Sequence, residues 1–369
     1  MGDAYTPGLT VTRSTVVRKS RRLPLPGDVL RKVGDRVTSD DVVARTQLPG
    51  KVHLMNLATA LGAMPDELAG KLLVKPGDPV KKGQSVAESK SFFGLFTSRA
   101  LAPIDGTLES VSEVTGQAIF REPPVPVEVK AYVDGKVVEI HEGEGVVVET
   151  DAAMIQGIFG LAGEVVAPLV VVAKQAGQTL EASDLGPEHK GKVVVGGGRA
   201  TLDAMRRAMD LKIAAVVCGG FAYQDVKELL GYDVGVAVTG TEQLATTLVV
   251  TEGFGDIAMA SATFELLRSL EGRVASVCGA TQIRAGVIRP EVVIPDAGKA
   301  DDQAAAGGLE IGAPVRCIRA PYFGRIGKVS ALPVELATMA SETQVRVLEV
   351  DLGSERIMVP RANVEVIER

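Results

Sequence analysis

Apolar and polar positions follow two different patterns along the 369-residue chain. Residues 1–150 contain short Val-rich runs separated by Gly, Pro and Asp, which is typical of strands joined by tight turns. From about residue 186, continuous apolar runs alternate with stretches in which apolar positions recur every three to four residues. The first region is therefore predicted to be a β-rich module and the second an α/β layer domain.

The α/β region is predicted to hold strands covered by helices. The runs VVV, AAVVC and VGVAV are apolar throughout, as expected for a parallel sheet with helices on both faces. Leu202, Met205 and Met209 lie on one face of the first predicted helix. Two further runs, TTLVVTEG and RVASVCGATQ, are separated by another helical stretch. We therefore predict a largely parallel sheet in this domain.

Two stretches of the N-terminal module look like copies of one sequence motif. LPGDVLRKVGDRVTSDDVVA lies near residue 26 and VKPGDPVKKGQSVAE near residue 76. Each has a Gly-Asp turn, a second turn a few residues later, and then a Val-containing strand. Between them, VHLMNLATALG has apolar positions at helical spacing, with Gly62 as a possible C-cap. The pattern predicts an internal duplication with a short helix between the copies.

A small, polar, Gly- and Ala-rich stretch near residue 300 is typical of a flexible linker, and short β runs follow it. The chain is thus expected to be a multidomain protein of α/β and β units. The predicted divisions are a β-rich module at 1–150, a β connection at 151–185, the α/β domain at 186–296, a linker at 297–310 and a β unit at 311–369.

The second copy of this motif, followed later by APIDGTLESV, resembles the biotinyl/lipoyl-type barrel-sandwich hybrid. The resemblance is nearest to the versions in subunits of membrane-associated ferredoxin and quinone oxidoreductases, and it implies this fold over residues 70–120. In carrier proteins a modified lysine lies at a hairpin tip, whereas Lys90 lies near a strand end here, so no attached cofactor is expected. The matching positions are Gly77, Asp78, Val80, Gly83, Gln84, Ala87, Ala102, Pro103, Asp105 and Gly106.

The hairpin between these two half-motifs has an apolar tip. Large apolar side chains on a protruding hairpin are costly in water, so they need a surface to cover them. One alternative is that the tip folds onto the protein's own second module, and the other is that it inserts into a partner or another subunit. The candidate partner-binding residues are Phe92, Phe93, Leu95 and Phe96.

Residues 311–368 resemble a KOW-type SH3-like barrel, as found in ribosomal proteins and transcription elongation factors. The resemblance implies contact with nucleic acid. Residues 312–369, however, carry eight basic and seven acidic side chains, and they contain no basic stripe with interleaved aromatic residues. This composition favours a barrel used for protein contact. The matching positions are Gly312, Val315, Ile318, Phe323, Gly324, Gly327 and Val329.

The ends of the predicted α/β strands carry the candidate chemistry. Ligands bind beyond the carboxyl ends of parallel strands, where loops and helix N-termini converge. If these strands are parallel and adjacent, their ends form one rim suited to a small anion, with a Glu as general base and Arg284 holding the anion. The alternative is that these groups only cap helices and lock loops. The candidate ligand-binding residues are Gly197, Gly198, Thr241, Glu242, Glu252, Gln282 and Arg284.

Charge and cysteine content narrow the classes of function. The 46 acidic and 40 basic residues give a net charge of −6, which argues against nucleic acid and anionic lipid as partners. No apolar run reaches the ~18 residues of a membrane span and no secretory signal is evident, so a cytoplasmic protein is expected. Cys218, Cys278 and Cys317 lack CxxC spacing and the three histidines are scattered, so neither a disulfide framework nor a metal site is expected.

Two modules of types used for docking therefore flank one domain without an assembled catalytic motif. We expect a non-catalytic scaffold or adaptor subunit of a multiprotein assembly, formed with other protein subunits or as a homo-oligomer. The alternative is an enzyme or regulatory sensor that binds a small anionic metabolite at the strand ends of the α/β domain.

Overall fold

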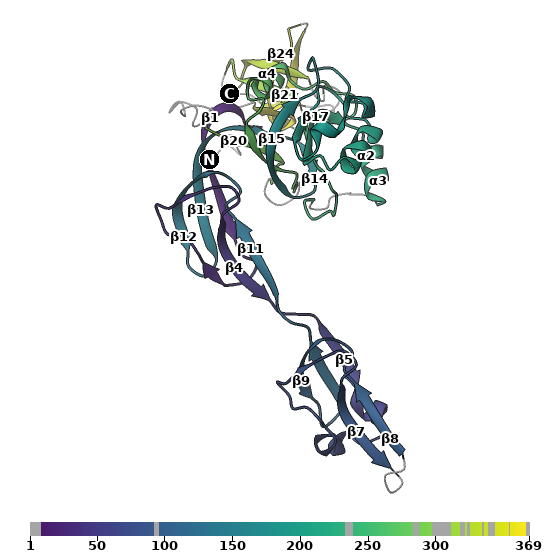
Figure 1. The fold of residues 1–369 in the computed structure, drawn as a ribbon. Coiled ribbons are helices and arrows are strands. Elements are labelled where there is room, and N and C mark those ends of the chain that lie inside the picture. Colours follow the sequence, from purple (N-terminus) through teal and green to yellow (C-terminus); the bar gives the residue numbers. More distant parts are fainter. Residues whose placement is uncertain are drawn as a thin grey trace.

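The computed structural model describes residues 9–91, 96–232, 239–282, 288–296, 311–317, 322, 325–333, 336–338, 344–353 and 355–366. The fold is mostly β, with a mixed central sheet and short helices. Figure 1 shows an elongated molecule with an α/β body at one end, a β stem in the middle and a distal β module at the other end.

Two long strands form the axis of the stem. β1 (Val11–Arg22) and β13 (Gly145–Gln156) pair antiparallel over their whole length. The last residues of β13 also pair with β20 (Glu291–Pro295) of the body, so stem and body share one sheet. The predicted boundary at residue 150 falls inside β13. The other stem strands are β2 (Asp28–Val29), β3 (Arg36–Val37), β4 (Val42–Leu48), β11 (Val125–Lys130) and β12 (Gly135–His141).

The distal module comprises residues 51–122 and has its own apolar core. The predicted short helix is confirmed as α1 (Leu57–Leu61), since the Asn56 side chain accepts from Thr59 N and Gly62 ends the helix at positive φ. A 3₁₀ turn (Pro65–Gly70) follows α1. A four-stranded sheet contains β5 (Val52–Asn56), β10 (Gln117–Arg121), β9 (Gly106–Val111) and β6 (Pro79–Val80), and β7 (Ser85–Ser91) pairs with β8 (Phe96–Leu101).

The stem and the distal module are built on one repeated plan. In the stem, Lys32 N donates to the Asp35 carboxylate at 2.8 Å, and in the distal module Lys75 N donates to Asp78 at 2.8 Å. Six residues later a second turn closes in each copy, from Thr38 N to Asp41 and from Lys81 N to Gln84. The structure therefore supports the duplication and aligns residues 32–44 with residues 75–87.

The second half of each module repeats as well. Asp134 accepts from Ser39 N at 2.6 Å in the stem, and Asp105 accepts from Lys82 N at 2.9 Å in the distal module. In the duplication, the β4–β11 pair of the stem corresponds to the β7–β8 pair of the distal module. The distal module is inserted at the end of the β4–β11 pair, at the position where a hairpin joins β7 to β8 in the distal module. One copy is thus inserted into the other.

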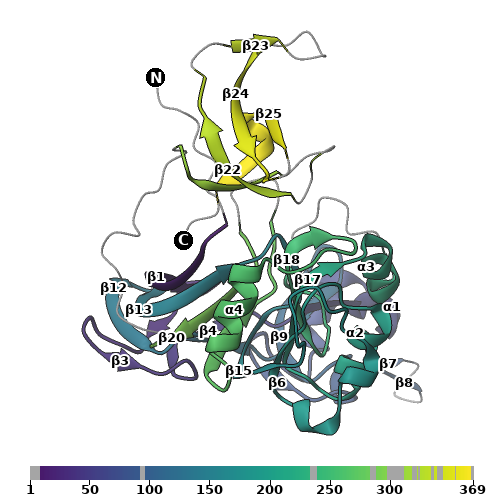
Figure 2. The ribbon, with the colours of Figure 1, turned by 90° about the horizontal axis from the view of Figure 1, so that it is seen from above.

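The body is an α/β layer structure with a mixed sheet (Figure 2). Four strands are parallel, namely β15 (Glu164–Val171), β16 (Val193–Val195), β17 (Ala215–Phe221) and β18 (Thr247–Phe254). The other pairings are antiparallel: β14 (Phe159–Leu161) pairs with β18, β19 (Val274–Cys278) with β15, and β20 (Glu291–Pro295) with β19. The expectation of a largely parallel sheet therefore holds for those four strands alone, and the run VGVAV lies outside the described residues.

Helices cover both faces of the parallel strands. α2 (Leu202–Asp210) and α3 (Tyr223–Leu230) bury apolar side chains on one face, and α4 (Ser261–Ser269) does so on the other. The predicted first helix is confirmed as α2, with Met205 fully buried. No helix in the described part of the chain is long and apolar enough to cross a membrane.

The C-terminal unit is a small antiparallel β structure with its own core. Residues 297–310, predicted to be a linker, lie outside the described residues, as do Ile318, Phe323 and Gly324 of the predicted KOW pattern. Its strands are β21 (Pro314–Cys317), β22 (Ile326–Ala331), β23 (Leu336–Thr338), β24 (Gln344–Asp351), β25 (Arg356–Pro360) and β26 (Val364–Val366).

Candidate functional site

The predicted strand-end residues lie at two separate places. β19 runs antiparallel to β15, so its last residue, Cys278, pairs with Glu164 at the start of β15. The expectation of one common rim is therefore wrong, because the segment after β19 returns to the edge where the parallel strands begin. Glu252 lies at the opposite end, near the end of β18. Arg284 lies outside the described residues.

Glu242 holds a loop at the edge where the parallel strands begin. Its carboxylate accepts from Gly240 N at 2.7 Å and from Ala162 N at 3.0 Å. Gln282 N donates to Ile288 O, and Thr241 is exposed. These contacts fit the loop-closing alternative, in which the polar groups satisfy nearby backbone atoms.

The glycines after β16 allow a close backbone approach. A Cβ atom on Gly197 would lie 2.3 Å from Gln175 O, so that position has no room for a side chain. Gly198 N donates to Gln178 O at 2.7 Å. The segment from Gln175 to Gln178 therefore occupies the place where the sequence predicted an anion against free backbone N–H groups.

Glu252 forms a buried ion pair with Arg316 of the C-terminal unit. Both side chains are almost completely buried, at 3% and 2% exposure. Arg316 Nη1 also donates to Thr251 O at 3.1 Å, and Glu252 accepts from Ala260 N at the start of α4. Arg316 therefore joins the C-terminal unit to the carboxyl end of β18. The sequence analysis missed it, and the one signal was a charged residue inside the apolar run PVRC.

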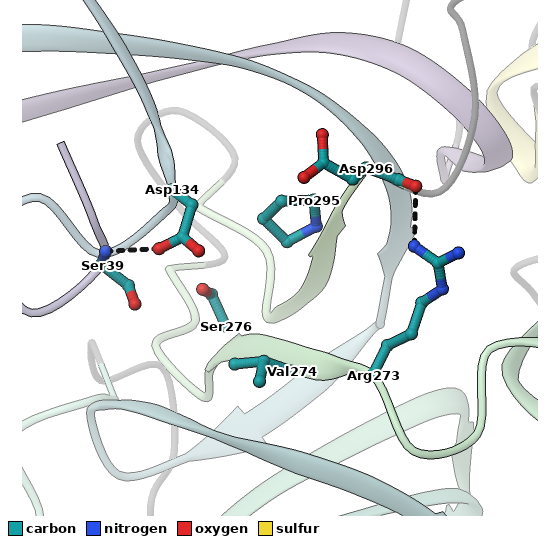
Figure 3. Close-up of a pocket in the computed structure, with 7 residues that line it drawn as sticks. All are labelled: Ser39, Asp134, Arg273, Val274, Ser276, Pro295 and Asp296. Carbon is teal, nitrogen blue, oxygen red and sulfur yellow. Dashed lines mark hydrogen bonds between the residues drawn. The ribbon is translucent and has the colours of Figure 1, made fainter. Parts of the chain in front are cut away.

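A cavity of about 200 Å³ lies between the stem and the body (Figure 3). Ser39 and Asp134 contribute from the stem, where Ser39 N donates to Asp134. On the body side, Arg273 Nη1 donates to Asp296 O at 2.7 Å, and the Ser276 hydroxyl donates to Tyr132 O at 2.5 Å. The remaining lining residues are Val274 and Pro295.

Comparison with models of protein families and with curated proteins found no match.

Tyr132 lies beside the cavity in an uncommon conformation. Its φ is +72°, a region that costs free energy for a residue with a large side chain. The ring is buried under the Arg21 guanidinium, 5.2 Å from the ring centroid. Burial raises the pKa of the phenol, and the nearby Glu291 carboxylate raises it further. The Tyr132 hydroxyl makes no hydrogen bond to the described residues.

Two ion pairs near Tyr132 tie the end of β1 to the body. Arg21 binds Glu164 through two nitrogens at 2.6 and 2.7 Å, and Lys19 binds Glu291 at 2.5 Å. Glu164, Cys278 and Glu291 are paired neighbours on β15, β19 and β20, so they share one face of the sheet. Both carboxylates are thus neutralised by cations from the stem.

The thiols in this structure are poor nucleophiles. Burial raises the pKa of Cys278 to about 11 and that of Cys218 to about 12, and it also raises the pKa of Cys317. The thiolate is the reactive form, so each side chain is mostly a protonated thiol near neutral pH. Among the described residues, no group of His, Cys, Asp and Glu is arranged to hold a metal ion.

Proposed function

We propose that this protein is a non-catalytic adaptor subunit of a multiprotein assembly, and that its distal module contacts a second copy of this chain. The observation that carries the proposal is the position of that module, which two chain crossings hold away from the body (Figure 1). The crossings lie side by side, since Glu122 N donates to Lys51 O at 2.9 Å and Arg121 Nη1 donates to Gly50 O at 3.2 Å.

The surface chemistry of the distal module supports protein contact. Residues 51–122 contain eight basic and eight acidic side chains, so the module has no net charge in a chain of net charge −6. A groove of about 400 Å³ runs along Leu68, Leu72 and Val111. Apolar surface without excess charge favours contact with protein over contact with a polyanion. The exposed large apolar side chains of the distal module include Val52, Leu54, Met64, Leu73, Leu101 and Val114.

The resemblances seen in the sequence agree with this role. The two repeated modules are proposed to be barrel-sandwich hybrids used as a scaffold, and the C-terminal unit an SH3-like barrel used for protein contact. Phe92, Phe93 and Leu95 lie outside the described residues, and Phe96 is the first residue of β8. These four apolar residues are the proposed contact residues.

The rival function, binding of a small anion at the strand ends, gains less support. Glu252 is paired with Arg316, and Glu242 accepts from two backbone N–H groups. Each carboxylate therefore has a role within the fold that leaves little capacity for a ligand.

Excision of the distal module tests the proposal. Leu48 pairs with Val125, so replacing residues 49–124 by Asn-Gly closes the β4–β11 pair as a hairpin with a two-residue turn. The full chain is expected to form an assembly larger than a monomer by light scattering. The shortened chain is expected to unfold cooperatively, as the full chain does, but to have the mass of a monomer.

A point variant separates the tip from the rest of the module. Phe93→Ser with Phe96→Ser is expected to lower the assembly mass, whereas Leu25→Ser, which changes an exposed apolar residue of the stem, is expected to leave it unchanged. A full chain that is already monomeric, or an assembly mass unaffected by both the excision and the tip variant, overturns the proposal.

A further inference from the structure

The cavity between stem and body carries charges of both signs that the fold leaves unpaired. Within the described parts of the chain, Asp134, Asp296 and Arg273 take part in no ion pair. This differs from the neighbouring Glu164 and Glu291, which are both paired with cations. All three residues are exposed to solvent, and together they line one concave site, where charges without an ion-pair partner can contact a ligand that bears charge itself.

The hydroxyl of a largely buried serine also faces the cavity. Ser39 is 9% exposed, and its hydroxyl makes no hydrogen bond to the described residues. Figure 3 shows the Ser39 hydroxyl and the Asp134 carboxylate on one side of the cavity and the Arg273 side chain on the other. Pro295, Val274, Ser276 and the Asp296 carboxylate lie between them. The cavity therefore has an acidic end at Asp134 and a basic end at Arg273, and the surface between them is mixed, with apolar groups and the Asp296 carboxylate.

The volume sets the size of the ligand. About 200 Å³ is several times the ~30 Å³ share of one water molecule, and it is below the ~300–1,000 Å³ of pockets that hold drug-sized ligands. A ligand of a few heavy atoms fits this space.

We infer that this cavity binds a small zwitterion of the amino-acid class, with its ammonium group at Asp134 and Ser39 and its carboxylate at Arg273. An ammonium group has three donors, which the Asp134 carboxylate and the Ser39 hydroxyl accept. The Arg273 guanidinium uses Nη1 for Asp296 O and keeps other N–H groups for a ligand carboxylate. Two acidic side chains against one basic side chain disfavour a simple anion.

Binding is tested by calorimetry with probes that vary in charge. Glycine, β-alanine and 4-aminobutyrate carry both charges at increasing separation, whereas butyrate and butylamine carry one charge each. At millimolar concentrations we expect at least one zwitterion to bind the full chain and to raise its Tm, and both single-charge probes to bind more weakly.

The duplication supplies a matched control. Asp134→Asn and Asp105→Asn weaken the same turn contact in the two modules, but Asp134 alone borders the cavity. Asp134→Asn and Arg273→Met are expected to weaken binding roughly 10- to 100-fold, as for loss of hydrogen bonds between charged groups. Asp105→Asn and the surface change Arg268→Met are expected to leave it unchanged.

Three results overturn the inference. They are no binding of any zwitterion, equal binding of butyrate or butylamine, and equal loss of binding in Asp105→Asn and Asp134→Asn. If Asp134→Asn does not fold, Arg273→Met and Ser39→Ala test the two ends separately.

Discussion

Removal of the Arg316 side chain tests how the C-terminal unit is held. Arg316→Met keeps much of the apolar part of the side chain but leaves the Glu252 carboxylate buried without its cation. Breaking a buried ion pair by removing one partner costs about 3–5 kcal/mol, because the remaining charge is desolvated and uncompensated. The expected loss in the free energy of unfolding is therefore about 3–5 kcal/mol.

A double-mutant cycle separates the pair from its surroundings. Glu252→Gln keeps an oxygen that accepts from Ala260 N, while it removes the charge. The double variant, Arg316→Met with Glu252→Gln, no longer buries an unpaired charge, so it is expected to recover about 2 kcal/mol or more relative to the sum of the single changes. Urea unfolding followed by circular dichroism measures all four proteins, and limited proteolysis reports release of the C-terminal unit.

The control is an ion pair on the surface. Arg206 binds Glu228 at 2.6 Å with both side chains about half exposed, so Arg206→Met is expected to cost about 0–1 kcal/mol. If Arg316→Met also costs less than about 1 kcal/mol, the pair behaves as an exposed one, and the argument from burial is refuted.

Two further predictions concern the groups around the stem–body junction. Tyr132→Phe removes a buried hydroxyl without a hydrogen bond to the described residues, so it is expected to raise the free energy of unfolding by about 1 kcal/mol; a decrease in urea unfolding experiments would contradict this. At pH 8 a thiol with the pKa of Cys278, about 11, is roughly 0.1% thiolate, against about a tenth for an ordinary pKa of 9.0. Iodoacetamide is therefore expected to alkylate the native protein slowly at pH 8 and faster as pH rises toward 11, whereas the unfolded chain reacts at once. Mass spectrometry showing one rapidly modified cysteine in the native protein at pH 8 would count against the buried environment.

Local chemistry made parts of this fold predictable. In each Lys-x-Gly-Asp turn, the Asp carboxylate accepts from the backbone N–H of the Lys three residues earlier. Both turns can therefore be predicted from the sequence. α2 was predictable because its apolar residues recur at helical spacing. The correct register of the duplication was harder to see, because PGD occurs in both stretches, whereas the structural match is between Lys32 and Lys75.

Features set by distant contacts were not predictable. The apolar run of β19 looks the same whether the strand is parallel or antiparallel, so its direction, and with it the position of Thr281, stayed open. Arg316 and Glu252 are 64 positions apart in the sequence, and no local sequence pattern indicates that they form an ion pair. The cavity draws its lining from Ser39, Asp134 and the ends of β19 and β20, which meet only in the folded chain.

The long β1–β13 pair has a consequence for synthesis of the chain. More than 120 residues separate Arg22, at the end of β1, from its partner Gly145 at the start of β13, and the distal module is contained within that interval. At ~5–20 residues per second, a ribosome leaves β1 without its partner strand for on the order of 10 s, while the distal module has time to fold first. Arg18, Lys19 and Arg21 give the waiting strand positive charge, which discourages pairing with other nascent chains.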